Sequence, residues 1–276
     1  MKRRSRFVIA ASMLLLVIGC DGARVARAQN SAEGTFQRTL NVSGPVDLDV
    51  STNSGRIEIR AGTSSRVEVR GRIRAYDRFF GSRDVGRIIR DIESNPPIEQ
   101  NGNVIRIGRI NNSDYRDHVS ISYEINVPVN TQARSRTGSG SQEIAGIEGP
   151  IDANTGSGSI RLRDVRNGVA ASTGSGQIVA EAVKGAFRAR TGSGGIRVDG
   201  DPGERWDLST GSGSVVVRLP QQAAFDLDAR TSSGNVTVDH PITVSGRLRR
   251  NEVSGRVRGG GVVLDVRTGS GSIRIE

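Results

Sequence analysis

The chain has 276 residues, of which 36 are glycine and only 4% are aromatic, and its formal net charge is +10. That length fits one or two domains, and the shortage of aromatic residues argues against a single thick globular core. The excess positive charge is almost entirely arginine and suits an anionic partner, whereas the single cysteine excludes a disulfide framework and a thiolate metal cluster.

The N-terminus has the pattern of an export signal. A basic segment precedes an apolar run over residues 7–18, which is shorter than the roughly 20 residues that span a bilayer. The run ends in VIGC, which resembles a bacterial lipobox, so we predict that residues 1–19 are removed and that Cys20 is lipidated. Two acyl chains would anchor the protein stably in the cell envelope. Cleavage after Ala28 is the alternative and would give a secreted or periplasmic protein.

An N-terminal β-rich part is predicted over residues 36–130, after a linker over residues 20–35. Apolar residues alternate in several of its segments, as in strands, and the Ser54 to Gly55 pair suggests an early coil of the repeat that follows. One capping helix is expected near 82–93, where apolar residues form a single stripe that ends before two prolines. The aromatic cluster expected to pack beneath this helix consists of Tyr76, Phe79 and Phe80.

A Ser-Gly pair recurs through residues 131–276, mostly at intervals of about 18 to 21 residues. The pairs begin at Ser139, Ser157, Ser175, Ser193, Ser212, Ser233, Ser254 and Ser270. Apolar alternation shifts by one position at each pair, which predicts two short strands joined at a corner. We expect glycine to supply a positive φ or a bulge there, and we expect Thr155 and Ser157 to point inward. The predicted fold is all-β, a single-chain parallel β-solenoid of about 18–21-residue coils with one short helix in its N-terminal part.

A family resemblance follows from these residues. The segment ISYEINVP over 121–128 and the T-x-S-G-x-[IV] units after it resemble the bacterial putative-adhesin, β-strand-repeat ("toast-rack") family, a domain of unknown function. The resemblance covers roughly residues 40–276. It implies the β-solenoid fold and an envelope location, and it supplies no catalytic residues.

No catalytic site, metal or cofactor is expected. The G-x-S-x-G nucleophile elbow does not occur, and the glycine-rich units lack the third glycine and the helix of a dinucleotide-binding loop. His118 and His240 are expected in exposed loops, and two histidines with one cysteine do not make a usual zinc site. The calcium-binding repeat G-G-x-G-x-D has only an isolated partial match.

Two alternatives remain open at this point. A β-helix enzyme acting on polysaccharide would need two carboxylates about 5–9.5 Å apart, and Asp207 and Asp228 are expected in consecutive coils. Arg188 and Arg230 lie near them in the predicted stack, so ion pairs are the simpler interpretation. The other alternative is an envelope-stress regulatory protein that acts through a protein partner.

Outward arginines form the candidate binding site. Stacking is expected to align Arg161, Arg197, Arg258 and Arg274 in one column that also contains Val179, Val216 and Thr237, with Arg163 beside it. This face is predicted to bind polyanions weakly, either acidic glycan or lipid headgroups, and nucleic acid is not expected. The chain ends directly after the strand SIRIE, so an unpaired terminal coil is expected to favour self-association. The function favoured is a non-catalytic envelope or secreted β-solenoid with a structural, adhesive or ligand-binding role.

Overall fold

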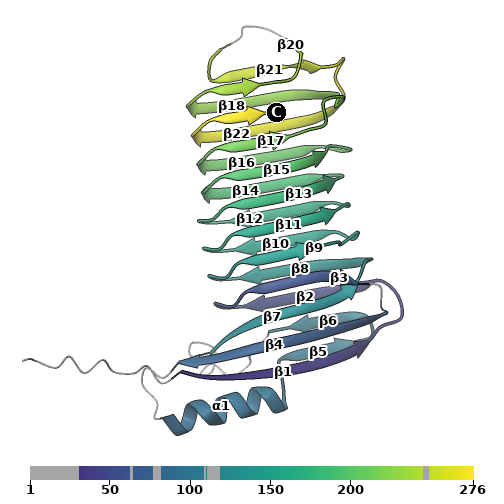
Figure 1. The fold of residues 1–276 in the computed structure, drawn as a ribbon, viewed down its shortest axis with the longest axis vertical. Coiled ribbons are helices and arrows are strands. Elements are labelled where there is room, and N and C mark those ends of the chain that lie inside the picture. Colours follow the sequence, from purple (N-terminus) through teal and green to yellow (C-terminus); the bar gives the residue numbers. More distant parts are fainter. Residues whose placement is uncertain (1–30, 63–64, 77–81, 109, 111–118, 245–248) are drawn as a thin grey trace, which may run out of the picture.

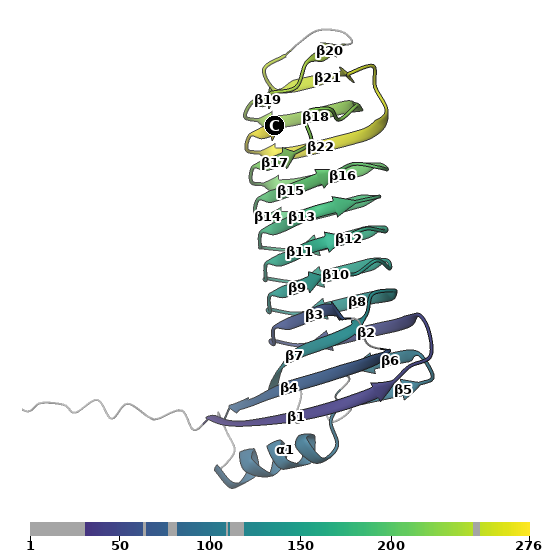
Figure 2. The ribbon, with the colours of Figure 1, turned by 45° about the vertical axis from the view of Figure 1, so that its right-hand side comes forward.

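The computed structural model describes residues 31–62, 65–76, 82–108, 110, 119–244 and 249–276. Their strands form two long sheets that face each other in a tall stack (Figure 1; Figure 2). The 11-stranded sheet A has the order β1 (Ser31–Asn41), β4 (Arg66–Tyr76), β7 (Val119–Pro128), β3 (Ile57–Gly62), β9 (Gln142–Ala145), β11 (Ile160–Val165), β13 (Ile178–Lys184), β15 (Ile196–Asp201), β17 (Val215–Arg218), β23 (Ile273–Ile275) and β19 (Val236–Val238). The 12-stranded sheet B has the order β20 (Ile242–Val244), β21 (Glu252–Val257), β18 (Phe225–Ser233), β22 (Val262–Ser270), β16 (Trp206–Ser212), β14 (Phe187–Ser193), β12 (Val169–Thr173), β10 (Ile151–Thr155), β8 (Thr131–Thr137), β2 (Val46–Thr52), β6 (Val104–Ile107) and β5 (Ile98–Asn101).

Each regular coil contributes one strand to sheet B and the next strand to sheet A. In one such coil β10 is followed by β11, and both pair in parallel with the corresponding strands of the preceding and following coils. Thr155 lies opposite Thr137 and Thr173, so one sequence repeat corresponds to one step of the stack. The inward side chains are mostly aliphatic and fill the space between the sheets, with Trp206, Phe187 and Phe225 among the largest. The predicted parallel β-solenoid is confirmed.

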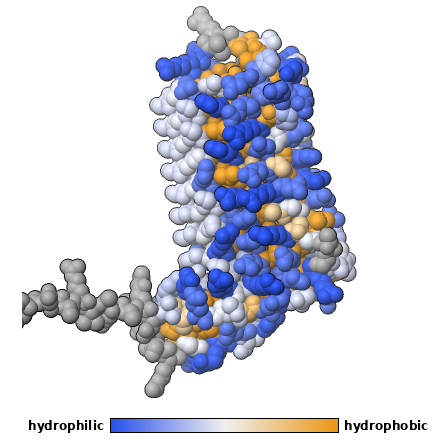
Figure 3. Space-filling view, in the orientation of Figure 1, coloured by the Kyte–Doolittle hydropathy of each residue, from blue (hydrophilic) through white to orange (hydrophobic). Residues whose placement is uncertain are grey.

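The repeated corner depends on close contact between successive coils. The Thr155 hydroxyl donates to the carbonyl oxygen of Gly140 in the preceding coil at 3.0 Å and accepts from the Gly158 N–H at 3.1 Å. A Cβ on Gly158 would collide with that same carbonyl oxygen, although Gly158 itself has no positive φ. Glycine is therefore needed at position 158 because the two coils approach closely. The positive φ or bulge expected from the sequence is not the reason at this position. Ser157, expected to point inward, is exposed. Figure 3 shows the stacked corners as a pale, serrated edge.

The N-terminal end consists of longer antiparallel strands and a helix. β1, β4 and β7 pair antiparallel at the end of sheet A, whereas β2 and β3 already stack in parallel on β8 and β9. The Ser54 corner therefore belongs to an early coil, as predicted. Helix α1 (Ser82–Ser94) lies in the segment expected to be helical and packs on β1 and β4 (Figure 1). Its buried apolar stripe consists of Val85, Ile88, Ile89 and Ile92.

At the C-terminal end, the stacking order differs from the chain order. The last coil, β22 and β23, lies between the coil of β16 and β17 and the coil of β18 and β19. Thr268 is opposite both Thr210 and Thr231, so this inserted coil keeps the register of the repeat. Two expectations are wrong. Ser254 lies in β21, an extended strand antiparallel to β18, and forms no corner. The C-terminal coil has no unpaired edge, because both of its strands are paired on two sides.

The N-terminal segment with Cys20 and Ala28 lies outside the described residues, as do Phe79, Phe80 and His118. Within the described part of the chain, no helix is long and apolar enough to cross a membrane.

Candidate anion-binding surface

The outer face of sheet A carries a row of arginines. Arg161, Arg197 and Arg274 lie in register across the strands, separated by Val179 and Val216. All three arginines are exposed, and none of their guanidinium groups has an ion pair or hydrogen bond with another described residue. They occupy every second strand, so neighbouring arginines of the row begin about 10 Å apart along the stack. These three residues are referred to below as the arginine row.

The position of the inserted coil in the stack determines which residues lie in the arginine row. Arg274 lies on β23, between β17 and β19, and so precedes Thr237 in the stack although it follows Thr237 in the chain. The prediction that Arg258 belongs to the row is wrong, because the Ser254 pair forms no corner. Arg258 follows β21 at a turn with a φ of 51°, and its Nε donates to the Gln221 carbonyl oxygen at 2.8 Å.

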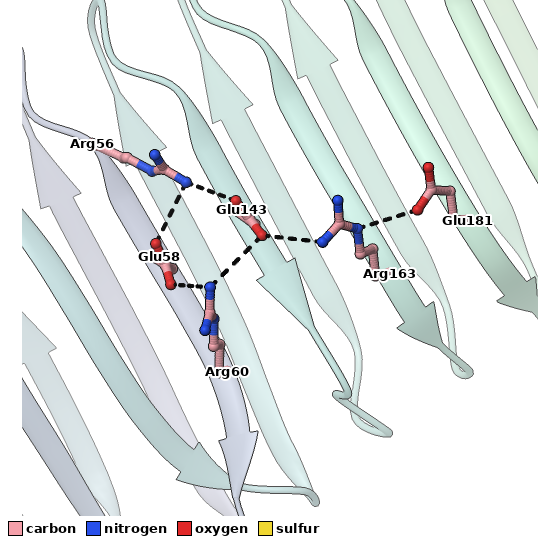
Figure 4. Close-up of polar contacts among 6 residues, drawn as sticks. All are labelled: Arg56, Glu58, Arg60, Glu143, Arg163 and Glu181. Atoms are coloured by element: carbon pink, nitrogen blue, oxygen red, sulfur yellow. Dashed lines mark hydrogen bonds and ion pairs between the residues drawn. The ribbon is translucent and has the colours of Figure 1, made fainter.

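Toward the N-terminal end, the same register of sheet A becomes negative. It continues through Glu143 on β9, Glu58 on β3 and Glu124 on β7, which are referred to as the glutamate band. Like charges directly opposite each other destabilise a sheet, and arginines at neighbouring positions compensate here (Figure 4). Nη2 of Arg56 lies 2.7 Å from Glu143 and 3.4 Å from Glu58, and Nη2 of Arg60 lies 3.9 Å from Glu143.

Arg163 belongs to this ion-pair network. Its Nη1 lies 3.6 Å from Glu143, and its Nε donates to Glu181 at 3.1 Å (Figure 4). Two carboxylates therefore neutralise Arg163, whereas the arginine row carries unpaired charge. Of the five arginines predicted as a polyanion site, the structure thus brings three together as free cations.

At its N-terminal end, sheet A is hollowed by a groove of about 690 Å³, which Glu58 and Glu124 of the glutamate band also line. Its cationic lining comprises Arg56 and three successive outward residues of β4, Arg70, Arg72 and Arg74. Arg74 forms an ion pair with Glu33 at 2.7 Å, and hydrogen bonds with Glu33 and then Tyr76 raise the pKa of its guanidinium. The guanidinium groups of Arg70 and Arg72 have no ion pair or hydrogen bond with another described residue.

Aromatic side chains support the groove from inside the core. Phe36 on β1 and Tyr123 on β7 meet edge to face, with ring centroids 6.3 Å apart, and β4 runs between their strands. Gly71 is required on β4 because a Cβ there would collide with the Phe36 ring. Tyr123 is 1% exposed, and burial raises the pKa of its phenol. Tyr76 is 41% exposed on the outward face of β4, so the prediction that it packs beneath the helix is wrong.

The groove was not predicted from the sequence. The alternation in RVEVRGRIRAY indicates a strand, and the same alternation places the arginines at 70, 72 and 74 on one face. That one-sided run of arginine is the signal from which a cationic site could be inferred. Its hollow shape depends on antiparallel pairing with β1 and β7, which the local pattern does not specify.

Comparison with known proteins assigns the chain to a family. The family model described as Toastrack DUF4097 matches residues 119–276, which is more than half of the chain. The chain belongs to the toast-rack family. No curated protein matches it.

Two solved structures are similar to this toast-rack chain at low identity. One is described as a "putative cell adhesion protein" from Clostridium sporogenes ATCC 15579; it is 12% identical, with 88% of this chain and 99% of that chain covered and a TM-score of 0.38. The other is a "putative adhesin" from Bacteroides fragilis NCTC 9343, 11% identical, with 88% and 97% covered and a TM-score of 0.42.

Sheet B of the toast-rack chain carries a row of aspartates. Asp207, Asp265 and Asp228 lie opposite one another on β16, β22 and β18, so the expectation that Asp207 and Asp228 occupy consecutive coils is wrong. The inserted coil separates them. Nε of Arg188 lies 3.6 Å from Asp207, and Nε of Arg230 lies 3.0 Å from Asp228, as the ion-pair interpretation predicts. Asp265 is paired with Arg205 and Arg267.

His240 is buried, and the prediction of an exposed loop residue is wrong. It is 8% exposed, and its ring meets the Phe225 ring edge to face at 5.7 Å, because the turn before β20 folds over the end of the core. Among the described residues, no group of three or more His, Cys, Asp or Glu side chains is arranged to hold a metal ion.

Proposed function

We propose that this protein is a non-catalytic structural or adhesive β-solenoid of the cell envelope, and that its arginine row binds an acidic glycan. The observation that supports the proposal is the regular spacing of Arg161, Arg197 and Arg274, each exposed and unpaired. Repulsion between charges about 10 Å apart in water is only about 0.4 kcal/mol, so the row is stable without a ligand. A polymer with repeated negative charges can contact all three arginines at once.

Each contact is expected to be weak. Exposed ion pairs contribute about 0.2–1 kcal/mol, and salt screens them beyond roughly 8–10 Å. Three contacts on one molecule therefore give low affinity and strong salt dependence. Adhesion through this face requires many copies of the protein to engage one polymer, in which case the weak contacts reinforce each other.

Salt-dependent retention on heparin tests this proposal. The variant Arg161→Ser/Arg197→Ser/Arg274→Ser should elute at lower salt than the unmodified protein. The control variant Arg188→Ser/Arg190→Ser/Arg230→Ser loses the same charge from ion-paired positions on sheet B and should elute at higher salt than the row variant. Unchanged retention of the row variant would refute glycan binding. Row-dependent binding to anionic phospholipid vesicles without heparin retention would instead assign the row to lipid headgroups.

We extend the proposal to anchoring of the envelope protein through lipidated Cys20. The lipobox-like VIGC ending supports this. Fractionation of cells that express Cys20→Ala tests it, because loss of both acyl chains should move the protein from the membrane to the soluble fraction. Unchanged partitioning between the two fractions would refute anchoring through Cys20.

A further inference from the structure

The groove at the N-terminal end of sheet A is electrostatically separate from the arginine row. The glutamate band lies between the row and the groove's unpaired arginines on β4, on three successive strands of the sheet, and its members Glu58 and Glu124 form one side of the groove. The band holds Arg56, Arg60 and Arg163 in ion pairs. An extended polyanion that covered both regions would therefore meet no unpaired cation among the described residues of the band. The groove therefore calls for a ligand of its own, and its assignment does not depend on the function proposed for the row.

The charge of the groove matches a ligand with one negative charge. Arg56 and Arg74 are already ion-paired with glutamates. Glu58, which also lines the groove, is one of these partners, since it pairs with Arg56. The remaining charged side chains of the lining are Arg70, Arg72 and Glu124, whose charges sum to one positive charge. A single carboxylate balances this charge, whereas a phosphate dianion would exceed it. The adjacent Glu124 further disfavours a second negative charge on the ligand.

Uncharged hydrogen-bonding groups lie on both sides of Arg72 and on one side of Arg70, whose other neighbour is Glu124 on β7. Gln37 on β1 lies opposite Arg70, while Thr35 on β1 and Ser122 on β7 lie on either side of Arg72. All six side chains line the groove. Hydroxyl and amide groups beside guanidinium groups suit a ligand with several hydroxyls and one acid group, and this combination is typical of an acidic sugar.

We propose that this groove binds a uronic acid unit of a saccharide, with the ligand carboxylate on Arg70 and Arg72. The two guanidinium groups project from the same face of β4, because their residues are two positions apart, and each can bind a carboxylate through parallel hydrogen bonds. Gln37 and Ser122 are placed to bond the sugar hydroxyls. The exposed ring of Tyr76, which also lines the groove, offers an apolar surface to the sugar ring.

Calorimetric titration of the full chain with trigalacturonic acid tests the proposal. Arg70→Ser/Arg72→Ser should weaken binding at least about tenfold, since it removes two charge-assisted contacts. Both arginines are exposed, so the fold should survive, and circular dichroism checks this. The matched control, Arg161→Ser/Arg197→Ser, removes the same charge from the same face. It should bind the trisaccharide normally even if its heparin retention falls.

Three further measurements distinguish a uronic acid site from a general anion site or a neutral sugar site. The charge-preserving variant Arg70→Lys/Arg72→Lys should also bind less tightly, because lysine lacks the planar, bidentate donor geometry of arginine. Equal affinity for neutral galactotriose, or unchanged affinity in the groove variant, would overturn the proposal. Displacement of the trisaccharide by equimolar inorganic phosphate would also overturn it, since the groove would then be a simple anion site.

Discussion

The regular coils from β8 to β17 and the coils at the C-terminal end of the stack have the same type of corner. They differ in the order in which the chain forms neighbouring coils. In the regular part each coil stacks on the coil that precedes it in the chain. At the C-terminal end the last coil separates two coils made earlier, with every threonine still in register. The corner therefore specifies how one coil fits another, and it does not specify which coil is the neighbour.

Contacts outside the corner distinguish the inserted position. Leu264 of the inserted coil lies opposite Trp206 on one side and Leu227 on the other. Asp265 is 7% exposed and pairs with Arg205, which immediately precedes β16. β21 then covers the far side of β18. The stacking order of the coils at this end thus depends on side chains particular to each coil and on the antiparallel strand β21.

Removal of the inserted coil should have the largest effect. Deleting residues 261–276 removes four core side chains that are each worth roughly 1.5–3 kcal/mol, so stability should fall by about 6 kcal/mol or more. Those side chains are Leu264, Val266, Ile273 and Ile275. Thermal unfolding followed by circular dichroism should show this loss, and a synthetic peptide of residues 261–276 should partly restore stability. An unchanged melting temperature would show that the other coils close the gap without cost.

Substitution of the corner glycine tests whether the two regions share one corner. Gly176→Ala in a regular coil and Gly271→Ala in the inserted coil would each drive a Cβ into a glycine carbonyl oxygen of the adjacent coil. Gly176→Ala should cost roughly 3 kcal/mol in urea denaturation, and Gly271→Ala at least as much, because its φ of 146° also disfavours alanine. Gly168→Ala is the control, because its Cβ meets no atom within 4 Å and only its φ of 56° opposes alanine, at about 1–2 kcal/mol. A much smaller cost at Gly271 than at Gly176 would contradict a common corner.

Removal of a corner hydroxyl should have an intermediate effect. Thr155→Val leaves the Gly140 carbonyl and the Gly158 N–H without their hydroxyl partner and should cost about 1–3 kcal/mol. Ser157→Ala, at the exposed position of the same corner, should change stability by less than about 0.5 kcal/mol. Urea midpoints measure both variants. Similar values for the two would mean that the threonine hydroxyl does not hold the coils together.

The smallest effect is expected at the opposite turn of the regular coils, where Ala182 has a φ of 54°. Ala182→Gly should raise stability by about 0.5–1 kcal/mol, because glycine adopts this backbone without the steric cost of a Cβ. Gly146, two coils earlier at the same turn, has a φ of 73°. Differential scanning calorimetry should show a higher melting temperature for this variant, and Ala186→Gly, which has no positive φ, should show a lower one.

The sequence predicted the features that repeat locally and missed those that depend on pairing between distant segments. The spacing of Ser157, Ser175 and Ser193 sufficed for the solenoid, since each corner sets its own register. The Ser254–Gly255 pair has the same sequence as a corner but lies in an antiparallel strand. The prediction that Arg258 belongs to the arginine row was wrong for this reason. The groove depends on β1, β4 and β7 coming together, and no period in the sequence relates Gln37 to Arg70 or Ser122.

The inserted coil also affects when the molecule can be completed during synthesis. The coils from β8 to β17 can stack one by one as the chain emerges, because each stacks on a coil made before it. The coil of β18 and β19 cannot reach its final neighbours until residues 262–276 have followed it. The arginine row is likewise incomplete until Arg274 arrives. Without residues 262–276, β17 and β19 would lose their shared neighbour β23, and the row would lack Arg274.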